Sequence, residues 1–225
     1  MGKKAIPVGI ENFEDIIKDN YYYVDKSMLI EDILVNRAAV TLFTRPRRFG
    51  KTLNMSMIKY FFDVRNKDEN RKLFEELKIF GSEYMKEQGK YPVIFVSLKD
   101  LRGDTWEDTF ENLKSFISDL YAEFEDMREI MNKRDKIKFD KIFYEEEKGD
   151  YETSLKLLSN YIYKYYGKKV IILIDEYDAP IINAFDKGYY NEAINFFQVF
   201  YSSALKTNDS LKYGILTGIT RIIKE

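Results

Sequence analysis

The stretch AAVTLFTRPRRFGKT, residues 38–52, decides how this chain is expected to fold. An apolar run is followed by a basic turn and then by Gly-Lys-Thr. A phosphate-binding loop has this form, because it needs a buried strand, a tight loop that exposes backbone N–H groups, and a helix whose N-terminus faces the phosphates. We expect Gly50 to let the backbone approach a phosphate, Lys51 to bridge the β- and γ-phosphates, and Thr52 to place its hydroxyl on Mg²⁺.

The loop departs from the full pattern at Arg45, where a glycine is usual. Arg45 precedes Pro46, and a residue before proline is pushed toward extended backbone. Arg45 can therefore finish the strand while Pro46 starts the turn, and glycine is not needed. Two further arginines add positive charge beside the phosphates, although they are equally well explained as surface residues. The residues expected to contact the nucleotide are Arg47, Arg48, Phe49, Gly50, Lys51, Thr52 and Leu53.

A second motif, VIILIDEYDAP (170–180), is an apolar run that ends in two acids. A buried carboxylate without a partner is costly, so acids at the end of a buried strand need a partner or a task. Asp175 fits the acid that holds Mg²⁺ together with Thr52, and Glu176 fits the base that orients the attacking water. The catalytic residues are therefore expected to be Glu176 and Lys51, and the alternative is that the two acids only cap the strand. Asp178 is expected to cap a helix that begins near residue 180, or to face the surroundings of the metal.

Four apolar runs predict buried strands, and helical patterns separate them. Nearly continuous apolar runs are typical of parallel strands that are covered on both faces, and the alternation predicts an α/β sheet with right-handed crossovers. One strand lies between the lysine strand and the acid strand, as in hydrolases that carry the neighbouring glutamate. Small-molecule kinases usually lack that glutamate, so a kinase is disfavoured. The predicted strands are residues 38–44, 92–98, 170–175 and 213–219.

Polar residues at the end of the fourth strand are candidates for sensing the γ-phosphate. They are Thr217, Thr220 and Arg221. Arg221 could instead pair with Glu176 or contact a neighbouring domain. Structural roles are at least as well supported for Thr220 and Arg221.

Composition excludes several kinds of chemistry. The 225 residues suit one domain and include no cysteine and no histidine, which excludes disulfides, thiol catalysis and histidine bases. The net charge of −2 gives no general attraction to nucleic acid or membranes. No apolar run is long enough to span a bilayer and no signal peptide is visible, so we expect a cytoplasmic protein.

We expect residues 1–225 to form a single domain, with a charged helical insertion or connection at residues 125–150. The charges of that segment are expected to form a solvated face. The chain ends directly after the fourth predicted strand, where such a sheet usually continues. We therefore expect the domain to be truncated at its C-terminus.

The motifs TRPRRFGKT, LIDEYDAP and LTGITRI, in that order, resemble the bacterial AAA-ATPase-like family, and so do IPVGIENFEDII and YYYVDKSMLI near the N-terminus. The resemblance implies a P-loop NTPase three-layer sandwich with a mostly parallel sheet of order 5-1-4-3-2, whose fifth strand is missing from this chain. It places Ile6–Gly9, and also Tyr23–Lys26, on the adenine side, although a simple N-terminal cover is equally compatible. Full-length members often carry a nuclease-like C-terminal domain, for which this chain has no room.

The function expected from these features is binding of ATP with Mg²⁺ and slow hydrolysis, as a conformational switch or motor for an attached domain or a partner. Self-association is possible, and turnover is expected to need an arginine from outside this chain. The alternatives are a non-catalytic nucleotide-binding scaffold and, less favoured, a nucleic-acid-binding domain that uses the arginines of the loop.

Overall fold

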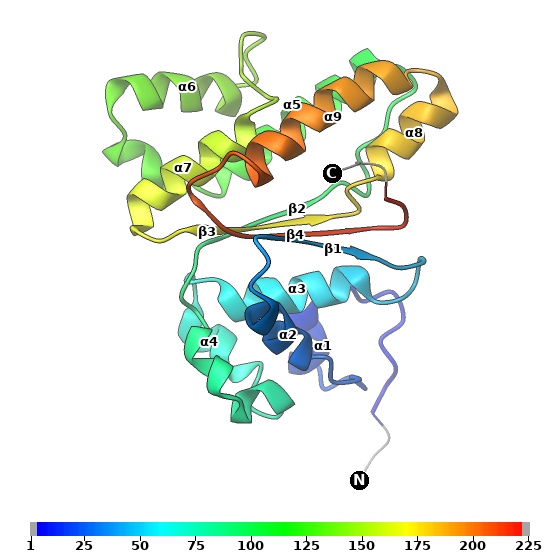
Figure 1. Cartoon of the computed structure of the whole chain (residues 1–225), viewed down its shortest axis with the longest axis vertical. Helices are drawn as coiled ribbons and strands as arrows, with labels where there is room; N and C mark the ends of the chain where they lie inside the picture. Colours follow the sequence, from blue (N-terminus) through cyan, green and yellow to red (C-terminus); the bar gives the residue numbers. More distant parts are fainter. Residues whose placement is uncertain (1–3, 222–225) are drawn as a thin grey trace.

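A central parallel sheet separates two layers of helices in the computed structural model, which describes residues 4–221 (Figure 1). The strand order is β1-β4-β3-β2, and every pairing is parallel. The four predicted strands are confirmed, with ends that differ by at most two residues from those expected. Their bounds are Val40–Thr44 (β1), Val93–Ser97 (β2), Val170–Asp175 (β3) and Leu211–Gly218 (β4).

The helices form one layer on each face of the sheet (Figure 1). The layer beside the loop motif contains α1 (Phe13–Lys18), α2 (Met28–Asn36), α3 (Lys51–Phe62), α4 (Lys67–Lys72) and the short 3-10 helices η1 (Lys78–Gly81) and η2 (Glu83–Glu87). The opposite layer contains α5 (Trp106–Ala122), η3 (Glu125–Ile130), α6 (Lys133–Phe143), α7 (Ser154–Tyr166), α8 (Ala179–Lys187) and α9 (Tyr190–Leu205). The molecule is therefore an α/β sandwich of three layers.

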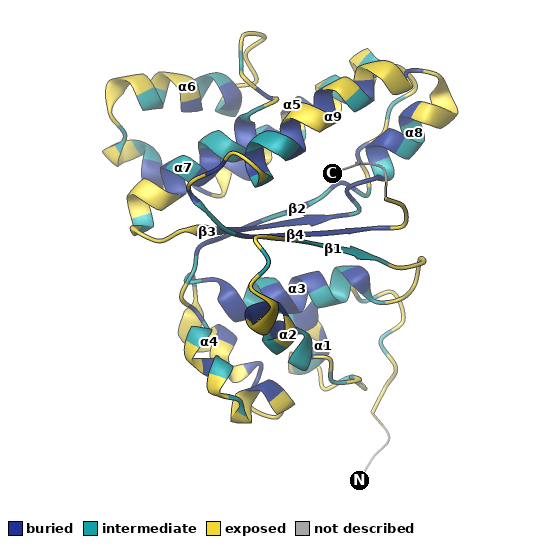
Figure 2. Ribbon diagram, in the orientation of Figure 1, coloured by how far each residue is buried: buried dark blue, intermediate teal, exposed yellow. Residues whose placement is uncertain are grey.

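The central strand β3 explains why its sequence is apolar throughout. Successive side chains point to opposite faces, so Ile171 and Leu173 join the core beside α3, while Ile172 and Ile174 join the core beside α9. All six residues of β3 are buried (Figure 2). The same alternation carries Asp175 to the α3 side, which is where the loop motif lies.

Local signals set several helix boundaries. Gly167 adopts a left-handed conformation (φ 63°) at the C-terminal end of α7, where glycine carries no side-chain penalty. The side chain of Thr105 caps α5 by accepting a hydrogen bond from the backbone N–H of Asp108. Among residues 4–221, no helix combines the length and apolar character needed to cross a membrane.

The charged segment 125–150 contains η3 and α6. Its apolar residues Met127, Phe139 and Ile142 are buried in the core beside α5 and α7, whereas most of its charged residues are exposed. The segment is thus helical over much of its length and contributes to the core. Its status as an insertion, and the single truncated domain 1–225, stay predictions.

The complete expected order 5-1-4-3-2 is not established. The four described strands account for four of its positions, and within residues 4–221 no fifth strand joins the sheet. Within that range, β1 is an edge strand whose one partner is β4. The fifth strand stays a prediction.

Candidate nucleotide-binding site

The loop between β1 and α3 has the backbone form expected from its sequence. The N–H of Arg45 donates to the carbonyl of Gly218 (3.2 Å), so Arg45 extends the pairing of β1 with β4 by one residue. The turn follows at residues 47–48, and Gly50 adopts a left-handed conformation (φ 70°) just before α3. No side chain caps α3. Its first N–H groups are therefore available to an anion at the carboxyl end of the sheet.

Lys51 is buried at the start of α3, and its ammonium turns back onto the loop. The Nζ atom donates to the carbonyl oxygens of Arg45 and Pro46, both at 3.0 Å. These two bonds hold a positive charge inside the curve of the loop. If a phosphate entered that curve, the Lys51 ammonium could donate to its charged oxygens instead of to the two carbonyls. Charged oxygens are the stronger acceptors.

Asp175 lies at the centre of a cluster that joins three elements. Its side chain is fully buried, and its oxygen Oδ2 accepts a hydrogen bond from the Thr52 hydroxyl (2.7 Å) at the start of α3. Its other oxygen, Oδ1, accepts a hydrogen bond from the Thr217 hydroxyl on β4. Asp175 forms no ion pair with any residue between 4 and 221. The carboxylate is thus buried beside two hydroxyls and has no cationic partner in the described chain.

This donor set fits Mg²⁺ better than a softer metal. Mg²⁺ prefers oxygen ligands and is usually held by one or two carboxylates together with phosphates and water. Asp175 and Thr52 supply a carboxylate and a hydroxyl at one point. In the described part of the chain, no group of three or more histidine or acidic side chains could hold a metal alone. Water and phosphate oxygens would complete the coordination.

Glu176 stands at the end of β3 in a strained backbone conformation. Its φ is 51°, which is uncommon for a residue with a side chain, and its N–H donates to the Thr217 hydroxyl oxygen (3.3 Å). Partial burial, and then the neighbouring Asp175, raise the pKa of Glu176 above its ordinary value of 4.5, while Lys99 and Lys51 act in the opposite direction. A carboxyl with a raised pKa beside a phosphate loop is a suitable proton acceptor for catalysis.

Asp178 is the N-cap residue of α8, so the predicted position is confirmed, but the expected side-chain cap is not: its side chain makes no capping hydrogen bond. Its oxygen Oδ2 instead accepts three hydrogen bonds: from the N–H groups of Ile219 and Thr220 (both 2.8 Å) and from the Thr220 hydroxyl (2.9 Å). The physical reason is that β4 ends beside Asp178. The backbone N–H groups that follow β4 need acceptors, and the buried carboxylate needs donors, so the two are paired. We call residues 178, 219 and 220 the β4 latch.

The sensor candidates therefore fall into different places. The Thr217 hydroxyl donates a hydrogen bond to Asp175, whereas Thr220 belongs to the β4 latch. Arg221 is exposed and lines a cavity between β1, β4 and α9, on the other face of the sheet. Sensing by any of the three stays a prediction.

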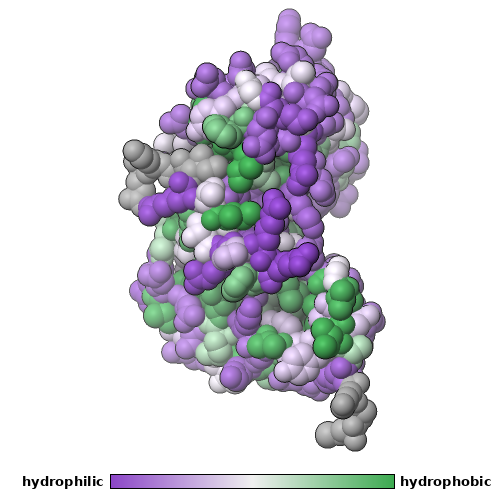
Figure 3. All heavy atoms as spheres, turned by 90° about the vertical axis from the view of Figure 1, so that its right-hand side faces the viewer, coloured by the Kyte–Doolittle hydropathy of each residue, from purple (hydrophilic) through white to green (hydrophobic). Residues whose placement is uncertain are grey.

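The remaining loop residues differ in how far their side chains are buried. Arg47 and Arg48 are exposed, and Arg48 has a positive φ of 67°. Phe49 is 58% exposed, while Leu53 packs against the core beside α3. Figure 3 looks onto this end of the sheet, where hydrophilic side chains gather across the middle of the molecule. Nucleotide contacts by these four residues stay predictions.

A cavity of about 390 Å³ adjoins the loop between α2, β1 and α3. Its walls include Met28, Leu29 and Phe43 together with Lys26 and Lys51. Lys26 reaches to 3.9 Å from the point where a side chain on Gly50 would begin. The sequence placed the segment ending at Lys26 near the nucleotide only through the family resemblance, because no local pattern marks that lysine. Ile6 and Val8 are 74% and 87% exposed, and neither lines this cavity.

Comparison with known proteins agrees with this geometry. A family model described as "Predicted AAA-ATPase" matches residues 7–225. An "Uncharacterized protein in vnfD 5'region" from Azotobacter chroococcum mcd 1 is 24% identical over 228 residues, which cover 100% of this chain and 39% of that protein. This chain therefore spans well under half the length of that relative. No solved structure matches this chain. Since the family model covers nearly the whole chain, the protein belongs to the AAA-ATPase-like family.

Proposed function

We propose that this chain binds Mg-ATP and hydrolyses it slowly, as a conformational switch for an attached domain or a partner. The observation that carries the proposal is the buried Asp175 carboxylate, which accepts hydrogen bonds from the hydroxyls of Thr52 and Thr217 and forms no ion pair within residues 4–221. Burying such a charge is expensive, and a protein retains that cost where function needs it. The basic loop beside Asp175 would bind the phosphates of a nucleotide, and Mg²⁺ would bind together with them.

Each residue then has a defined task. The Lys51 ammonium leaves the carbonyls of the loop and bridges the β- and γ-phosphates, while Gly50 lets the backbone approach. Thr52 and Asp175 would hold Mg²⁺, which supplies neutralisation of phosphate charge when it is bound. Glu176 accepts a proton from the attacking water, and its raised pKa suits that role. Hydrolysis is slow because an arginine from a partner or a second subunit is needed for full rate, an effect of about 10³–10⁵.

The switch rests on the connection between the two strands. Thr217 donates to Asp175 and accepts from the N–H of Glu176, so a change of ligands at Asp175 alters bonds to β4. The β4 latch lies two or three residues farther along both segments and fixes the bend at residues 219–220. Nucleotide binding can therefore bias the path of the chain after β4.

The proposal is tested by thermal unfolding and phosphate release. Mg-ATP at about a hundred times its dissociation constant should stabilise the wild type by roughly 2.7 kcal/mol. Lys51→Ala should abolish the shift, whereas Lys138→Ala, an exposed lysine on α6, should leave it unchanged. Glu176→Gln should retain the shift and lose phosphate release.

Three outcomes separate the alternatives. An equal shift in wild type and Lys51→Ala would show that the loop is not the nucleotide site. Binding in the wild type without any phosphate release, even with partners present, would favour a non-catalytic scaffold. DNA binding that weakens with salt and that ATP does not compete away would instead favour the nucleic-acid alternative.

A further inference from the structure

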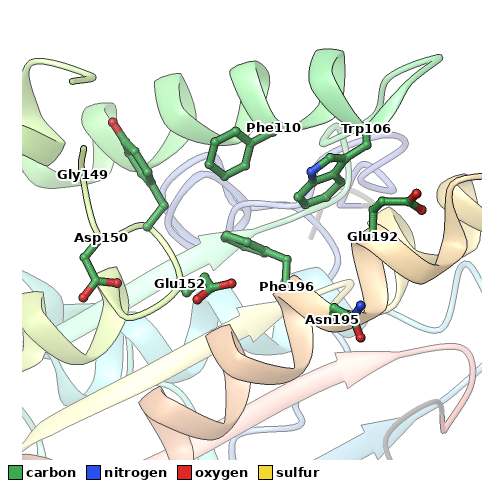
Figure 4. A pocket seen from close by; sticks show the side chains of 9 residues that line it. Trp106, Phe110, Gly149, Asp150, Glu152, Glu192, Asn195 and Phe196 are labelled. Atoms are coloured by element: carbon green, nitrogen blue, oxygen red, sulfur yellow. The ribbon is translucent and has the colours of Figure 1, made fainter. Parts of the chain in front are cut away.

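A cavity of about 440 Å³ opens in the helical layer formed by α5 and α9 (Figure 4). Its third wall is the segment 149–152, which precedes α7. It shares no lining residue with the cavity beside the phosphate loop, which lies on the other face of the sheet. We call it the aromatic groove, and any role that it has is separate from the proposed nucleotide site.

Four aromatic rings form the interior of the groove. The Phe110 ring lies 5.6 Å from Trp106, 5.7 Å from Phe196 and 5.7 Å from Tyr151, measured between ring centroids. Trp106 also lies 5.6 Å from Phe196, so these three rings pack against one another along the floor of the groove. Phe196 and Tyr151 are buried in the core, whereas Trp106 and Phe110 are only half-buried. Figure 4 shows the rings of Trp106, Phe110 and Phe196 turned toward the groove.

The segment 149–152, which forms the wall opposite the helices, is held in place by close packing. A side chain on Gly149 would begin only 2.7 Å from the Tyr151 ring, so only glycine lets the backbone pass there. The Tyr151 hydroxyl donates to the carbonyl of Glu146 (2.9 Å), which anchors the ring. The groove therefore exists before a ligand arrives, which lowers the cost of binding.

Acidic side chains surround the aromatic interior. Glu192 lies on the Trp106 side, and Asp150 and Glu152 lie toward the other end (Figure 4). All three are exposed, and none forms an ion pair with a residue in the described range 4–221. The Asp150 side chain accepts a hydrogen bond from the N–H of Thr153 (3.2 Å).

A lysine beside the groove is already paired with a carboxylate of its own helix. Lys114 lies 5.9 Å from the Phe110 ring centroid but pairs with Glu111 at 2.6 Å, and it does not line the groove. The groove therefore combines aromatic faces with carboxylates that lack a cationic partner. An apolar peptide would leave the carboxylates unused, and an anion would be repelled by them.

We propose that the aromatic groove binds the side chain of an arginine on a partner protein. A guanidinium is planar and weakly hydrated, so it can stack on the half-buried ring of Trp106 or Phe110. Its fork of donors matches carboxylates such as Glu152 and Glu192. A lysine ammonium is a compact and strongly hydrated charge that gains less from flat rings. The acids also attract a basic partner toward the groove before contact.

The test uses the fact that Trp106 is the only tryptophan of the chain. The peptide acetyl-Gly-Arg-Gly-amide is titrated into the full chain without nucleotide while tryptophan fluorescence is recorded. We expect a saturable change with this peptide, and little change with the matched citrulline peptide, which keeps the shape but lacks the charge. The matched lysine peptide and free spermidine are titrated in parallel and should bind more weakly than the arginine peptide.

A pair of matched variants locates the response. Glu152→Gln with Glu192→Gln should weaken binding by about fivefold, because two exposed ion pairs are lost. Glu75→Gln with Glu76→Gln changes the charge equally, at exposed positions outside the groove, and should have no effect. Thermal unfolding of both double variants should match the wild type, since the replaced carboxylates are exposed.

Several results would overturn the proposal. A response that rises linearly without saturation, or equally with the citrulline peptide, would show quenching without a site. Equal weakening in both double variants would show attraction by net charge alone. Binding by the lysine peptide as tight as by the arginine peptide would refute the role of the guanidinium, and tighter binding of spermidine would assign the groove to a small polyamine.

Discussion

The substitution Asp175→Asn should make the protein more stable when Mg²⁺ and nucleotide are absent. Asp175 is fully buried, and its carboxylate accepts hydrogen bonds from the hydroxyls of Thr52 and Thr217. Asparagine has nearly the same shape, and each hydroxyl can act as donor or acceptor toward it. The substitution therefore removes a buried charge and leaves the packing in place.

The size of the effect follows from two opposing contributions. Burying a carboxylate costs several kcal/mol, and asparagine avoids that cost. Two bonds to a charged acceptor, worth about 1.5–3 kcal/mol each, become neutral bonds worth about 0.5–1.5 kcal/mol each, a loss of about 2–3 kcal/mol in total. We expect a net gain of about 1–3 kcal/mol in the free energy of unfolding, at roughly 2–4 °C in Tm per kcal/mol for a chain of this size.

Asp178→Asn provides a matched control. Asp178 is also buried, but its oxygen accepts three hydrogen bonds, from two backbone N–H groups and the Thr220 hydroxyl. By the same values, the third weakened bond costs about 1–1.5 kcal/mol more. Asp178→Asn should therefore gain about 1–1.5 kcal/mol less stability than Asp175→Asn.

The assay is thermal unfolding followed by circular dichroism, first with a chelator and then with saturating Mg-ATP. Asp175→Asn should begin with a higher Tm than the wild type and gain much less from Mg-ATP. A lower Tm without nucleotide would mean that the carboxylate serves the fold. A gain from Mg-ATP equal to that of the wild type would mean that Asp175 does not hold the metal.

Three further predictions address single features. Gly50→Ala should cost about 1–2 kcal/mol of stability, because alanine is strained at φ 70°, and should also weaken Mg-ATP binding in titration calorimetry; Gly167→Ala, at φ 63°, should cost as much stability with unchanged affinity. Because the pKa of Glu176 is raised and only its deprotonated form accepts a proton, phosphate release should fall with decreasing pH at a value above 4.5. Lys99→Gln should move that fall to higher pH, and no movement would contradict the influence of Lys99. Tyr161→Phe should raise Tm by roughly 2–4 °C, because the buried Tyr161 hydroxyl has no hydrogen-bond partner among the described residues; a fall in Tm would show a hidden partner.

The strands were predictable because their signal is local. Each is a short apolar run, and the buried residues of β3 fill both cores as its continuous pattern indicated. The loop was predictable for the same reason, since Arg45, Pro46 and Gly50 act on the backbone of neighbouring residues. The end of α7 at Gly167 likewise follows from one residue with a left-handed conformation.

The role of Asp178 was not predictable from its neighbours. Its position before Ala179 and Pro180 is typical of a helix cap, yet its side chain bonds to residues about 40 positions away. Whether a short polar side chain caps its own helix or satisfies another strand depends on which backbone donors lie closest. The sequence pattern holds no information about that distance.

The sequence by itself determined the α/β class, the four strands, the phosphate-type loop and the acids at the end of β3, because periodicity and turn chemistry act over a few residues. Only the tertiary structure decided that Thr217 faces Asp175, that Lys26 approaches Gly50, and that distant aromatic and acidic residues share one groove. The parallel register sets the first of these, since Ile174 pairs with Leu216 and the next residues become neighbours. Such contacts arise when burial of apolar faces brings remote segments together, which no local pattern encodes.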